Sequence, residues 1–371
     1  MIEGLSLEHK WQRLAHREGP FVLWDRFGLS GHSGVAKHGM RLFSALGEKG
    51  AAPVLIPGPS RGGGGVLGRV RDSKLVWTRR LSQYLEGYSY LSGSIVHGLS
   101  NFNIPRSGRF HRRFKSVLTV HDVIPLLAPS DVSLSSKVQL QYCLTKLEPY
   151  LDMVVCVSEW TENALLERFP AYKGRTLVIP NGCPKVRLPD TAPTFEGFRL
   201  LSVARYERYK NFDLLFEIVR HLGEGCFLNL VTDDVGFRYS RERAGDLCED
   251  GRLTVFRNLS DRELSSLYAN SQVYLQPSRL EGYCLPLTEA LTCGVPCVYT
   301  SGSGMDEVAG DEIAIPMSPS ATGQMWAREI ARACGFLKSS DYYEKLGNYL
   351  KQKPSWGKVA DMYLKLYAKL V

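Results

Sequence analysis

Short apolar runs alternate with segments of helical periodicity over most of the chain. In the first half, the run FVLWD at residues 21–25 is followed by a glycine-rich turn and then by an amphipathic stretch at residues 36–48. Apolar runs of strand length recur at residues 117–120, 153–157 and 176–179. Regular alternation of strands and helices is typical of α/β proteins with parallel sheets.

The pattern weakens in the middle of the chain and then restarts. Residues 185–195 show little periodicity, and Pro184, Pro189 and Pro193 lie in or beside them, which is typical of a linker. Beyond the linker, the sequence predicts strands at residues 199–204, 228–231, 253–256, 273–276 and 296–299, and helices at residues 212–222, 261–269 and 286–292.

The predicted fold is therefore α/β, with two doubly wound, Rossmann-like domains that face each other across a cleft. We expect an N-terminal domain at residues 1–190, a second domain at residues 191–355 and a closing amphipathic helix at residues 356–371. Ligands of doubly wound sheets bind outside the carboxyl ends of the strands, so we expect a ligand there, between the two domains.

The composition excludes disordered, fibrous and membrane-spanning proteins. Hydrophobic residues make up 44% of the 371 residues and charged residues 23%, as in ordinary globular chains. No apolar run approaches the roughly 18 residues that cross a bilayer, and the N-terminus lacks the apolar centre of a signal peptide. The nine cysteines are odd in number and form no CxxC pair, which predicts reduced thiols and no zinc site. We expect a cytoplasmic protein.

Positive charge is concentrated in the first half of the chain. Residues 1–190 contain 25 basic and 15 acidic side chains, whereas the rest contains 21 and 23. Two stretches, 61–80 and 106–115, hold most of the excess, which favours an anionic partner such as a membrane leaflet, a phosphorylated glycan or lipid, or nucleic acid, over a merely solvated face. The expected anion-binding residues are Arg71, Lys74, Arg79, Arg80, Arg109, Arg112, Arg113 and Lys115.

The segment QPSRLEGYCLPLTEALTCGVPCV carries the most chemistry. It begins at the end of a predicted strand; Glu281 lies in the following turn, Pro286 marks a helix start, and Glu289 lies in the first turns of that helix. Carboxylates in a cleft accept hydrogen bonds from the vicinal hydroxyls of sugars and riboses. The alternatives are a solvated turn acid for Glu281 and helix-dipole complementation for Glu289. The amides between them, at Gly282, Tyr283, Cys284 and Leu285, are expected to form an anion site.

Two basic residues follow the first strand of the second half, in LLSVARYERYK. Arg205 and Lys210 there are suited to hold a diphosphate and to neutralise the charge that develops as it leaves, in place of a metal ion. The alternative is ordinary surface charge. No DxD triplet occurs, and the adjacent acids Asp233 and Asp234 are interpreted as turn and capping residues, so we expect no metal.

Two further candidates lie in the first half. Gly31 and Gly34 follow the first strand and allow close backbone approach at a helix start, although their spacing is not that of a dinucleotide fingerprint. His121 ends a predicted strand in TVHDVIPL, where it is placed to hydrogen-bond a substrate hydroxyl. The alternative is a histidine whose hydrogen bonds are satisfied within the protein.

Several segments in consistent order resemble the retaining glycosyltransferases of family 4, which have the GT-B fold. Residues 281–298 resemble the E-x7-E signature of that family. The resemblance extends to VSEWTENALLERF, VIPNG, LSVARYERYKNFDLLFE and LSDRELSSLYANSQVYLQPSRLEGYCLPLTEALTCGVP. TVHDVIPL is similar to a segment of bacterial mannosyltransferase-like members, and Trp356 fits the closing helix of the family. The resemblance covers about residues 21–308.

The resemblance assigns a role to each candidate in the second half, which becomes the donor-binding domain. It implies that Arg205 and Lys210 bind the donor diphosphate, that Glu281 hydrogen-bonds the transferred sugar, and that Glu289 binds the ribose. The amides of residues 282–285 would line the sugar and phosphates. Arg205, Lys210, Glu281 and His121 are the catalytic residues that it implies.

The first half becomes the acceptor-binding domain, and three further roles follow from the resemblance. The loop at residues 31–34 would close over the donor, and His121 would contact the sugar or the acceptor hydroxyl. Arg257 and Asn258, within the stretch 256–259, would meet the base. Asn258 and Cys284 stand where the family often has glycine, which affects base recognition and the size of the sugar pocket.

The expected function is a retaining transfer of a sugar from a nucleotide diphosphate to a hydroxyl of a glycan, a lipid-linked oligosaccharide or a lipopolysaccharide. GDP-mannose is the favoured donor and UDP-sugars are the second choice; no cofactor or metal is expected. The expected partners are the donor, the acceptor and the surface of an anionic membrane at its cytoplasmic face, not nucleic acid. The alternatives are a GT-B epimerase or phosphorylase and, with less support, a nucleic-acid-binding module.

Overall fold

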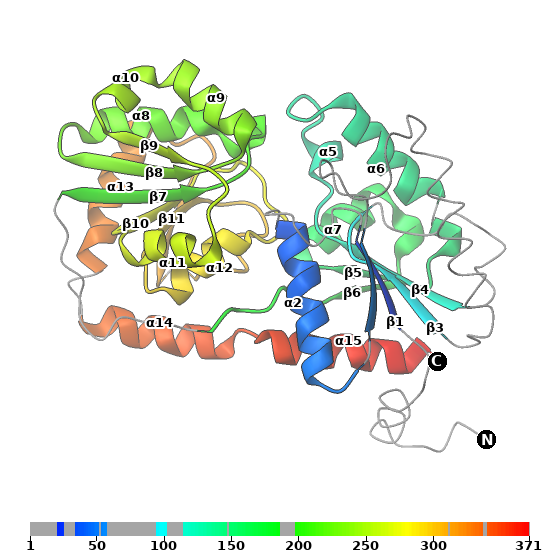
Figure 1. The fold of residues 1–371 in the computed structure, drawn as a ribbon. Helices are drawn as coiled ribbons and strands as arrows, with labels where there is room; N and C mark the ends of the chain where they lie inside the picture. The colour runs from blue at the N-terminus through cyan, green and yellow to red at the C-terminus, as the bar shows by residue number, and fades with distance from the viewer. Residues whose placement is uncertain are drawn as a thin grey trace, which may run out of the picture. The chain divides into compact units, whose positions relative to one another are not determined.

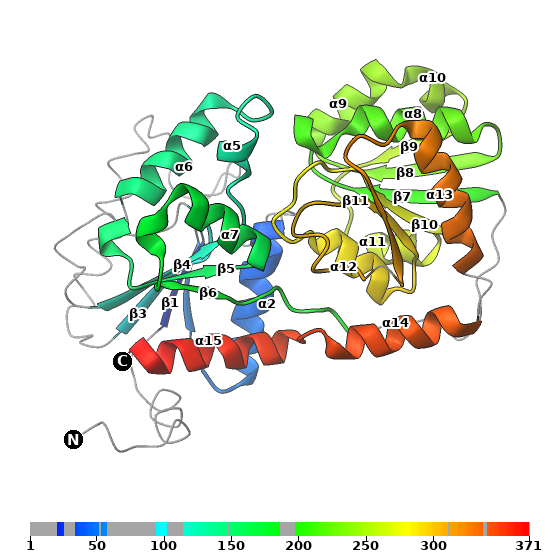
Figure 2. The same ribbon diagram turned by 180° about the vertical axis from the view of Figure 1, so that it is seen from behind.

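Contacts divide the chain into two compact units (Figures 1 and 2). The computed structural model describes residues 21–25, 34–51, 53–57, 94–101, 114–146, 148–185, 197–310, 312–336 and 340–370. The first unit is made from Met1–Val123, Ser135–Asn181 and Trp356–Val371, and the second from Ile124–Leu134 and Gly182–Ser355. The sequence predicts one boundary at residue 190, which lies outside the described residues.

The first unit is built on a parallel sheet with the order β2-β1-β3-β4-β5-β6. Its strands are β1 (Phe21–Asp25), β2 (Pro53–Pro57), β3 (Ser94–Gly98), β4 (Phe114–Val120), β5 (Met153–Cys156) and β6 (Thr176–Val178). Its helices are α2 (Gly34–Glu48), α6 (Leu134–Lys146), α7 (Glu159–Arg168) and α15 (Trp356–Leu370), with the short 3-10 turns η1 (Glu148–Tyr150) and η2 (Pro170–Tyr172).

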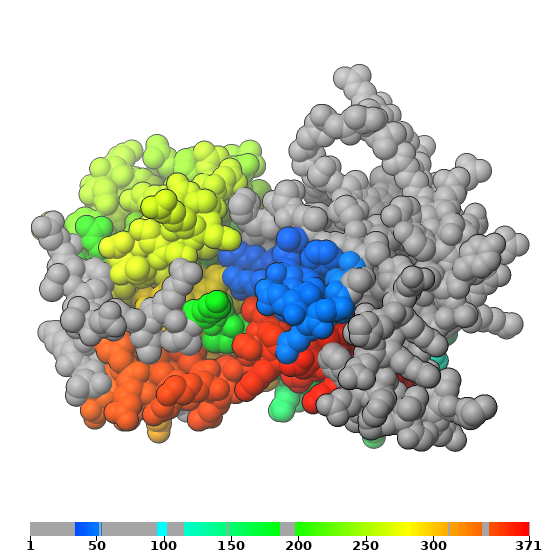
Figure 3. All heavy atoms as spheres, turned by 60° about the horizontal axis from the view of Figure 1, so that its bottom comes forward, coloured from blue at the N-terminus to red at the C-terminus, as the bar shows by residue number. Residues whose placement is uncertain are grey.

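The end of the chain completes the core of this first unit. Helices α2 and α15 lie side by side, and Figure 3 shows their outer faces in blue and red. Leu42 and Leu46 of α2 and Tyr363 and Tyr367 of α15 are fully buried in one hydrophobic cluster. The helix predicted to close the chain thus packs against the first predicted helix, from the other end of the sequence.

The second unit repeats the architecture with the sheet order β12-β11-β10-β7-β8-β9, again parallel throughout. Its strands are β7 (Phe198–Val203), β8 (Cys226–Val231), β9 (Leu253–Phe256), β10 (Val273–Gln276), β11 (Cys297–Thr300) and β12 (Ala314–Met317). Its helices are α5 (Ile124–Leu127), η3 (Arg208–Lys210), α8 (Phe212–Leu222), α9 (Asp234–Arg243), α10 (Gly245–Glu249), α11 (Asp261–Ala269), α12 (Leu285–Thr292), α13 (Gly323–Phe336) and α14 (Ser340–Gln352).

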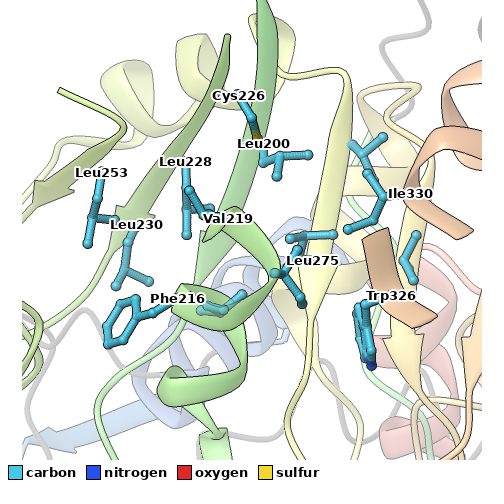
Figure 4. Packing of buried hydrophobic residues seen from close by; sticks show 14 of the residues in the cluster. Leu200, Phe216, Val219, Cys226, Leu228, Leu230, Leu253, Leu275, Trp326 and Ile330 are labelled. Carbon is cyan, nitrogen blue, oxygen red and sulfur yellow. The ribbon is translucent and has the colours of Figure 1, made fainter. Parts of the chain in front are cut away.

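Helices cover the sheet of the second unit, so its central strands are buried on both faces. Every residue of β10 and β11 is buried, as expected for a parallel sheet between two helical layers. Figure 4 shows one side of this core, where Leu228 and Leu275 from the strands meet Phe216 of α8 and Trp326 of α13. The fold class predicted from the hydrophobic pattern, two parallel α/β sheets, is confirmed.

The strand order of the second unit determines where a ligand meets it. The chain runs outward from β7 through β8 to β9 and then returns to place β10 on the other side of β7. The carboxyl ends of β7 and β10 therefore flank the point at which the strand order reverses, the usual ligand site of doubly wound sheets. The segments that follow these two strands contain Lys210 and Glu281.

Among the described residues, no helix is long and apolar enough to cross a membrane. All nine cysteines are described, and each is a free thiol. Cys183 and Ser355, which lie next to the two chain crossings between the units, form a parallel β-bridge, and the Cys183 amide donates to the Pro354 carbonyl at 2.8 Å.

Candidate functional site

Lys210 and Glu281 form an ion pair at the reversal point of the second sheet. Lys210 ends η3 after β7, Glu281 lies in the turn between β10 and α12, and Lys210 Nζ donates to Glu281 Oε1 at 2.6 Å. Their side chains are only 15% and 10% exposed. The alternatives, surface charge for Lys210 and a solvated turn acid for Glu281, are therefore wrong.

The ion pair keeps Lys210 charged. Burial alone disfavours the ammonium form, but the Glu281 carboxylate outweighs it and raises the pKa of Lys210 above its usual value. Nζ also lies 4.9 Å from the centre of the Tyr209 ring. A permanently charged ammonium in a mostly dehydrated position is suited to bind a phosphate oxygen.

The Glu281 carboxylate has a second donor that the sequence pattern does not single out. Gln276 Nε2, at the end of β10, donates to Glu281 Oε1 at 3.0 Å and to Ser278 Oγ at 2.6 Å. Among the described residues, Glu281 Oε1 thus accepts both side-chain hydrogen bonds of this carboxylate. Oε2 is the oxygen left to accept a hydrogen bond from a ligand hydroxyl.

The turn at residues 281–284 is held by close backbone contacts. Gly304 N donates to the Glu281 carbonyl at 3.0 Å, and a Cβ on Gly304 would lie 2.1 Å from the Gly282 carbonyl oxygen. Cys284 caps α12 in the left-handed region, with φ 74°. Glycine adopts that conformation without strain, which gives a physical reason why glycine is common there. Burial raises the pKa of the Cys284 thiol well above its usual value, so the thiol stays neutral.

Glu289 is a buried carboxylate in the second turn of α12. Tyr268 OH, from α11, donates to its Oε2 at 3.3 Å. The first turn of α12 contains no acidic residue, so the alternative of dipole complementation there is wrong. Its predicted contact with a ribose stays a prediction.

Other predicted donor-site residues lie apart from this ion pair. Arg205 is 61% exposed, and its Nε lies 3.7 Å from Asp233, which caps α9 as expected by accepting from Gly236 N at 2.9 Å. Arg257 pairs with Asp234 at 2.7 Å and lies over the ring of Phe237. No interaction within the described part of the chain joins Arg205 or Arg257 to Lys210 or Glu281.

Asn258 has a left-handed backbone and an exposed side chain. Its φ of 52° again fits a position where glycine is unstrained. Its predicted contact with a base, like that of Arg257, stays a prediction. In the first unit, Gly34 begins α2, whereas Gly31 lies outside the described residues.

His121 follows β4 and is held in one orientation. Its Nε2 hydrogen-bonds the Leu99 carbonyl at 2.8 Å, so this nitrogen carries the proton, and its backbone amide donates to Asn101 Oδ1 at 3.0 Å. Burial lowers its pKa to about 4, and the His38 ring packs edge-on at 4.9 Å. This geometry agrees with the alternative of an internally satisfied histidine; Nδ1 is the atom that remains for the predicted substrate contact.

Acid is expected to destabilise the first unit through its buried histidines. Burial lowers the pKa of His97 to about 3 and that of His121 to about 4, from 6.5. The unfolded chain therefore binds protons between pH 6.5 and 4 that the folded chain does not. The stability contributed by these neutral histidines is present above pH 6.5 and is lost as the pH falls through that window, on the order of 2 kcal/mol for each at pH 5.

Urea unfolding at pH 7 and pH 5 measures this effect. His97→Gln should reduce the loss of unfolding free energy between the two pH values, whereas His221→Gln, on the exposed surface of α8, should leave it unchanged. Equal losses in the native protein and both variants would contradict the assignment.

Most of the predicted anion surface lies outside the described residues. Arg71, Lys74, Arg79, Arg80, Arg109, Arg112 and Arg113 belong to that group. Lys115, at the start of β4, is described: it is exposed and pairs with Asp152 at 3.4 Å. No cluster of three or more metal-ligating side chains occurs in the part of the chain that is described.

Known proteins resemble the chain in both sequence and structure. Residues 193–353 match the family model described as "Glycosyl transferases group 1". O-antigen chain mannosyltransferase B of Escherichia coli is 24% identical over 298 residues, covering 72% of this chain and 75% of the relative. The phosphatidylinositol N-acetylglucosaminyltransferase of Homo sapiens contains one polypeptide that is 23% identical over 296 residues, which are 75% of this chain but only 58% of that polypeptide.

The solved structures agree over nearly the whole chain. A sucrose-phosphate synthase from Thermosynechococcus elongatus superposes with a TM-score of 0.75 at 19% identity, covering 95% of this chain and 99% of that one. Anabaena Alr3699/HepE in complex with UDP-glucose gives a TM-score of 0.75 at 14% identity, with 94% and 99% covered. The chain has the GT-B fold of these glycosyltransferases, and its residues 193–353 form a glycosyltransferase group 1 domain.

Proposed function

We propose that the protein is a retaining glycosyltransferase of family 4 that transfers a sugar from a nucleotide diphosphate to an acceptor hydroxyl without a metal ion. The observation that carries the proposal is the buried Lys210–Glu281 pair at the carboxyl ends of β7 and β10. Glu289, eight residues after Glu281 and buried on α12, completes the E-x7-E pattern of that family.

Each end of the donor has a chemically matched group in this site. Lys210 would bind the diphosphate through its permanent charge, assisted by Arg205. Glu281 Oε2 would accept a hydrogen bond from the transferred sugar, and Glu289 one from the ribose. The amides of residues 282–285 would line the sugar and the phosphates.

The reaction needs charge stabilisation more than a nucleophile. As the bond between the sugar carbon and the diphosphate oxygen breaks, negative charge grows on the diphosphate, where Lys210 and Arg205 stabilise it. The acceptor hydroxyl forms the new glycosidic bond on the same face of the sugar and gives its proton to the departing phosphate oxygen. His121 would orient the sugar or the acceptor hydroxyl.

GDP-mannose is the proposed donor. The similarity of TVHDVIPL to mannosyltransferase-like proteins supports it, as does a relative named as an O-antigen chain mannosyltransferase. UDP-sugars are the second choice, because one structural neighbour was solved with UDP-glucose.

A thermal unfolding series with nucleotides tests the donor site. GDP, UDP, ADP, TDP and CMP are each added with and without magnesium. A ligand at a hundred times its dissociation constant should stabilise the fold by about 2.7 kcal/mol. One diphosphate should raise the midpoint without magnesium, and the Lys210→Met variant should respond less. A native protein that none of the nucleotides stabilises would contradict the proposal.

The acceptor is proposed to be a hydroxyl of a glycan, a lipid-linked oligosaccharide or a lipopolysaccharide, reached at an anionic membrane surface. The positive charge of residues 1–190 supports this, and two relatives are named for O-antigen and phosphatidylinositol substrates. Binding to vesicles with anionic lipid should weaken steeply as salt is raised from about 0.05 M to 0.5 M, because screening shortens the Debye length. Salt-independent binding would contradict the electrostatic account.

A further inference from the structure

Gln276 connects the buried interior of β10 to the Glu281 carboxylate. The side chain is 1% exposed. Tyr274 OH, two residues earlier on the strand, donates to Gln276 Oε1, and Gln276 Nε2 donates to both Ser278 Oγ and Glu281 Oε1. The hydrogen-bonding capacity of the amide is thus spent on a defined set of partners, one of which is the carboxylate proposed to bind the sugar.

Tyr274 determines which way the amide points. Its ring and hydroxyl are fully buried, and burial raises the pKa of the hydroxyl well above its usual value, so it stays protonated. A protonated hydroxyl donates to the amide oxygen, and the NH2 group must then face Glu281. The opposite amide orientation would place a carbonyl oxygen 3.0 Å from a carboxylate oxygen, which is repulsive.

Lys210 has two tasks that compete. In this structure its ammonium is bonded to Glu281 Oε1 at 2.6 Å, whereas the proposed function uses the same group to stabilise the leaving diphosphate. When Lys210 turns to a phosphate, Glu281 loses its charged donor inside a mostly buried site. A carboxylate without donors there would be costly and free to rotate.

We propose that Gln276 is a positioning residue for the reaction: it keeps the Glu281 carboxylate oriented, with Oε2 toward the sugar, when Lys210 moves to the diphosphate. This inference rests on the proposed function. The amide suits the task because it is neutral and locked by Tyr274, so an incoming phosphate does not attract it away from Glu281.

Few charged groups surround this contact. Lys210 from η3 faces Glu281, Glu207 and Arg205 precede it in the same segment, and Cys284 and Tyr274 face the pair from the turn and the strand. Burial keeps Cys284 and Tyr274 neutral. Burial also raises the pKa of Glu207, against the opposing charges of Arg205 and Lys210. A new carboxylate at position 276 would therefore interact chiefly with Glu281 and Lys210.

The test substitutes a group that can imitate the amide only when protonated. In Gln276→Glu, two carboxyl groups lie in contact and are expected to share one proton, with a raised pKa. The protonated acid donates to Glu281 as the amide does. Once the shared proton is lost, the two carboxylates repel each other and Glu281 is displaced, so function is retained at low pH and lost as the pH rises.

The readout is the contribution of the sugar to affinity. Calorimetry gives the ratio of the dissociation constants of GDP and GDP-mannose, with UDP and UDP-glucose as a second pair. In Gln276→Glu this ratio should equal that of the native protein at pH 5.5 and fall about tenfold for each pH unit above the shared pKa. Gln272→Glu is the matched control: at the other end of the same strand, Gln272 Oε1 accepts from Arg199 N at 2.8 Å, and the ratio should not depend on pH.

A second variant keeps the inference testable if the new charge impairs folding. Tyr274→Phe removes the donor that orients the amide and should lower the sugar ratio about threefold to tenfold at every pH, with the affinity for GDP alone unchanged. Native-like sugar ratios in both Gln276→Glu at pH 8 and Tyr274→Phe would overturn the positioning role while leaving the proposed function intact. A native protein that binds neither nucleotide sugar would overturn both.

Discussion

Replacing Lys210 with alanine is expected to lower turnover about a hundredfold, corresponding to about 3 kcal/mol of lost transition-state stabilisation. The reason is the position of its ammonium: the side chain is mostly buried, permanently charged and located at the carboxyl end of β7. A charge in such a position needs little reorganisation when negative charge develops on the diphosphate. Steady-state kinetics with the donor identified in the nucleotide series measures the effect.

The same substitution leaves Glu281 as an unpaired carboxylate, so stability has to be separated from catalysis. Breaking a buried ion pair on one side costs roughly 3–5 kcal/mol, whereas neutralising both partners costs much less. Lys210→Met combined with Glu281→Gln should therefore regain most of the thermal midpoint lost in Lys210→Met but none of the turnover. Lys351→Ala, on the exposed surface of α14, is the control. Recovery of turnover in the double variant would show that Lys210 acts only through stability.

Gly304→Ala is expected to destabilise the second unit by roughly 3 kcal/mol and to abolish donor binding. The new Cβ would lie 2.1 Å from the Gly282 carbonyl oxygen and 3.0 Å from that of Glu281. Both atoms belong to backbone, which cannot rotate away as a side chain does. The turn that carries Glu281 must therefore move, and the hydrogen bond from Gly304 N must lengthen.

Urea unfolding and nucleotide titration together measure this effect. Gly335→Ala is the matched control, because a Cβ there meets nothing within 4 Å and the residue lies in a helix. That variant should be neutral or more stable by about 0.5–1 kcal/mol. Native stability and donor affinity in Gly304→Ala would show that the turn adapts and that its geometry is not tightly specified.

The fold was accessible from the sequence because parallel sheets leave a strong pattern. Strands such as β10 and β11 are buried on both faces and therefore appear as continuous apolar runs between helical segments. The pattern locates strand ends, and chemistry at strand ends is what identified Lys210 and Glu281. The weak periodicity near residue 190 does not reveal that Ile124–Leu134 groups with the second unit, because that depends on contacts between distant segments.

The supporting residues of the site could not be predicted in the same way. Gln276 and Tyr274 lie within a buried strand, where a sequence pattern indicates only core positions. Gly304 contacts the Glu281 turn from the segment after β11, more than twenty residues later, and nothing local marks that approach. Arg205 shows the opposite failure: its place after β7 is the same as that of Lys210, but its side chain points to solvent and Asp233.

The packing of α15 against α2 also has a consequence for biosynthesis. The hydrophobic cluster around Leu42 and Leu46 stays open until Tyr363 and Tyr367 have been synthesised and have left the ribosome. The second unit, which is complete by Ser355, has all its strands available earlier. The part of the protein that is made first thus finishes folding last, and a nascent chain arrested before residue 356 would expose the apolar face of α2 to chaperones and proteases.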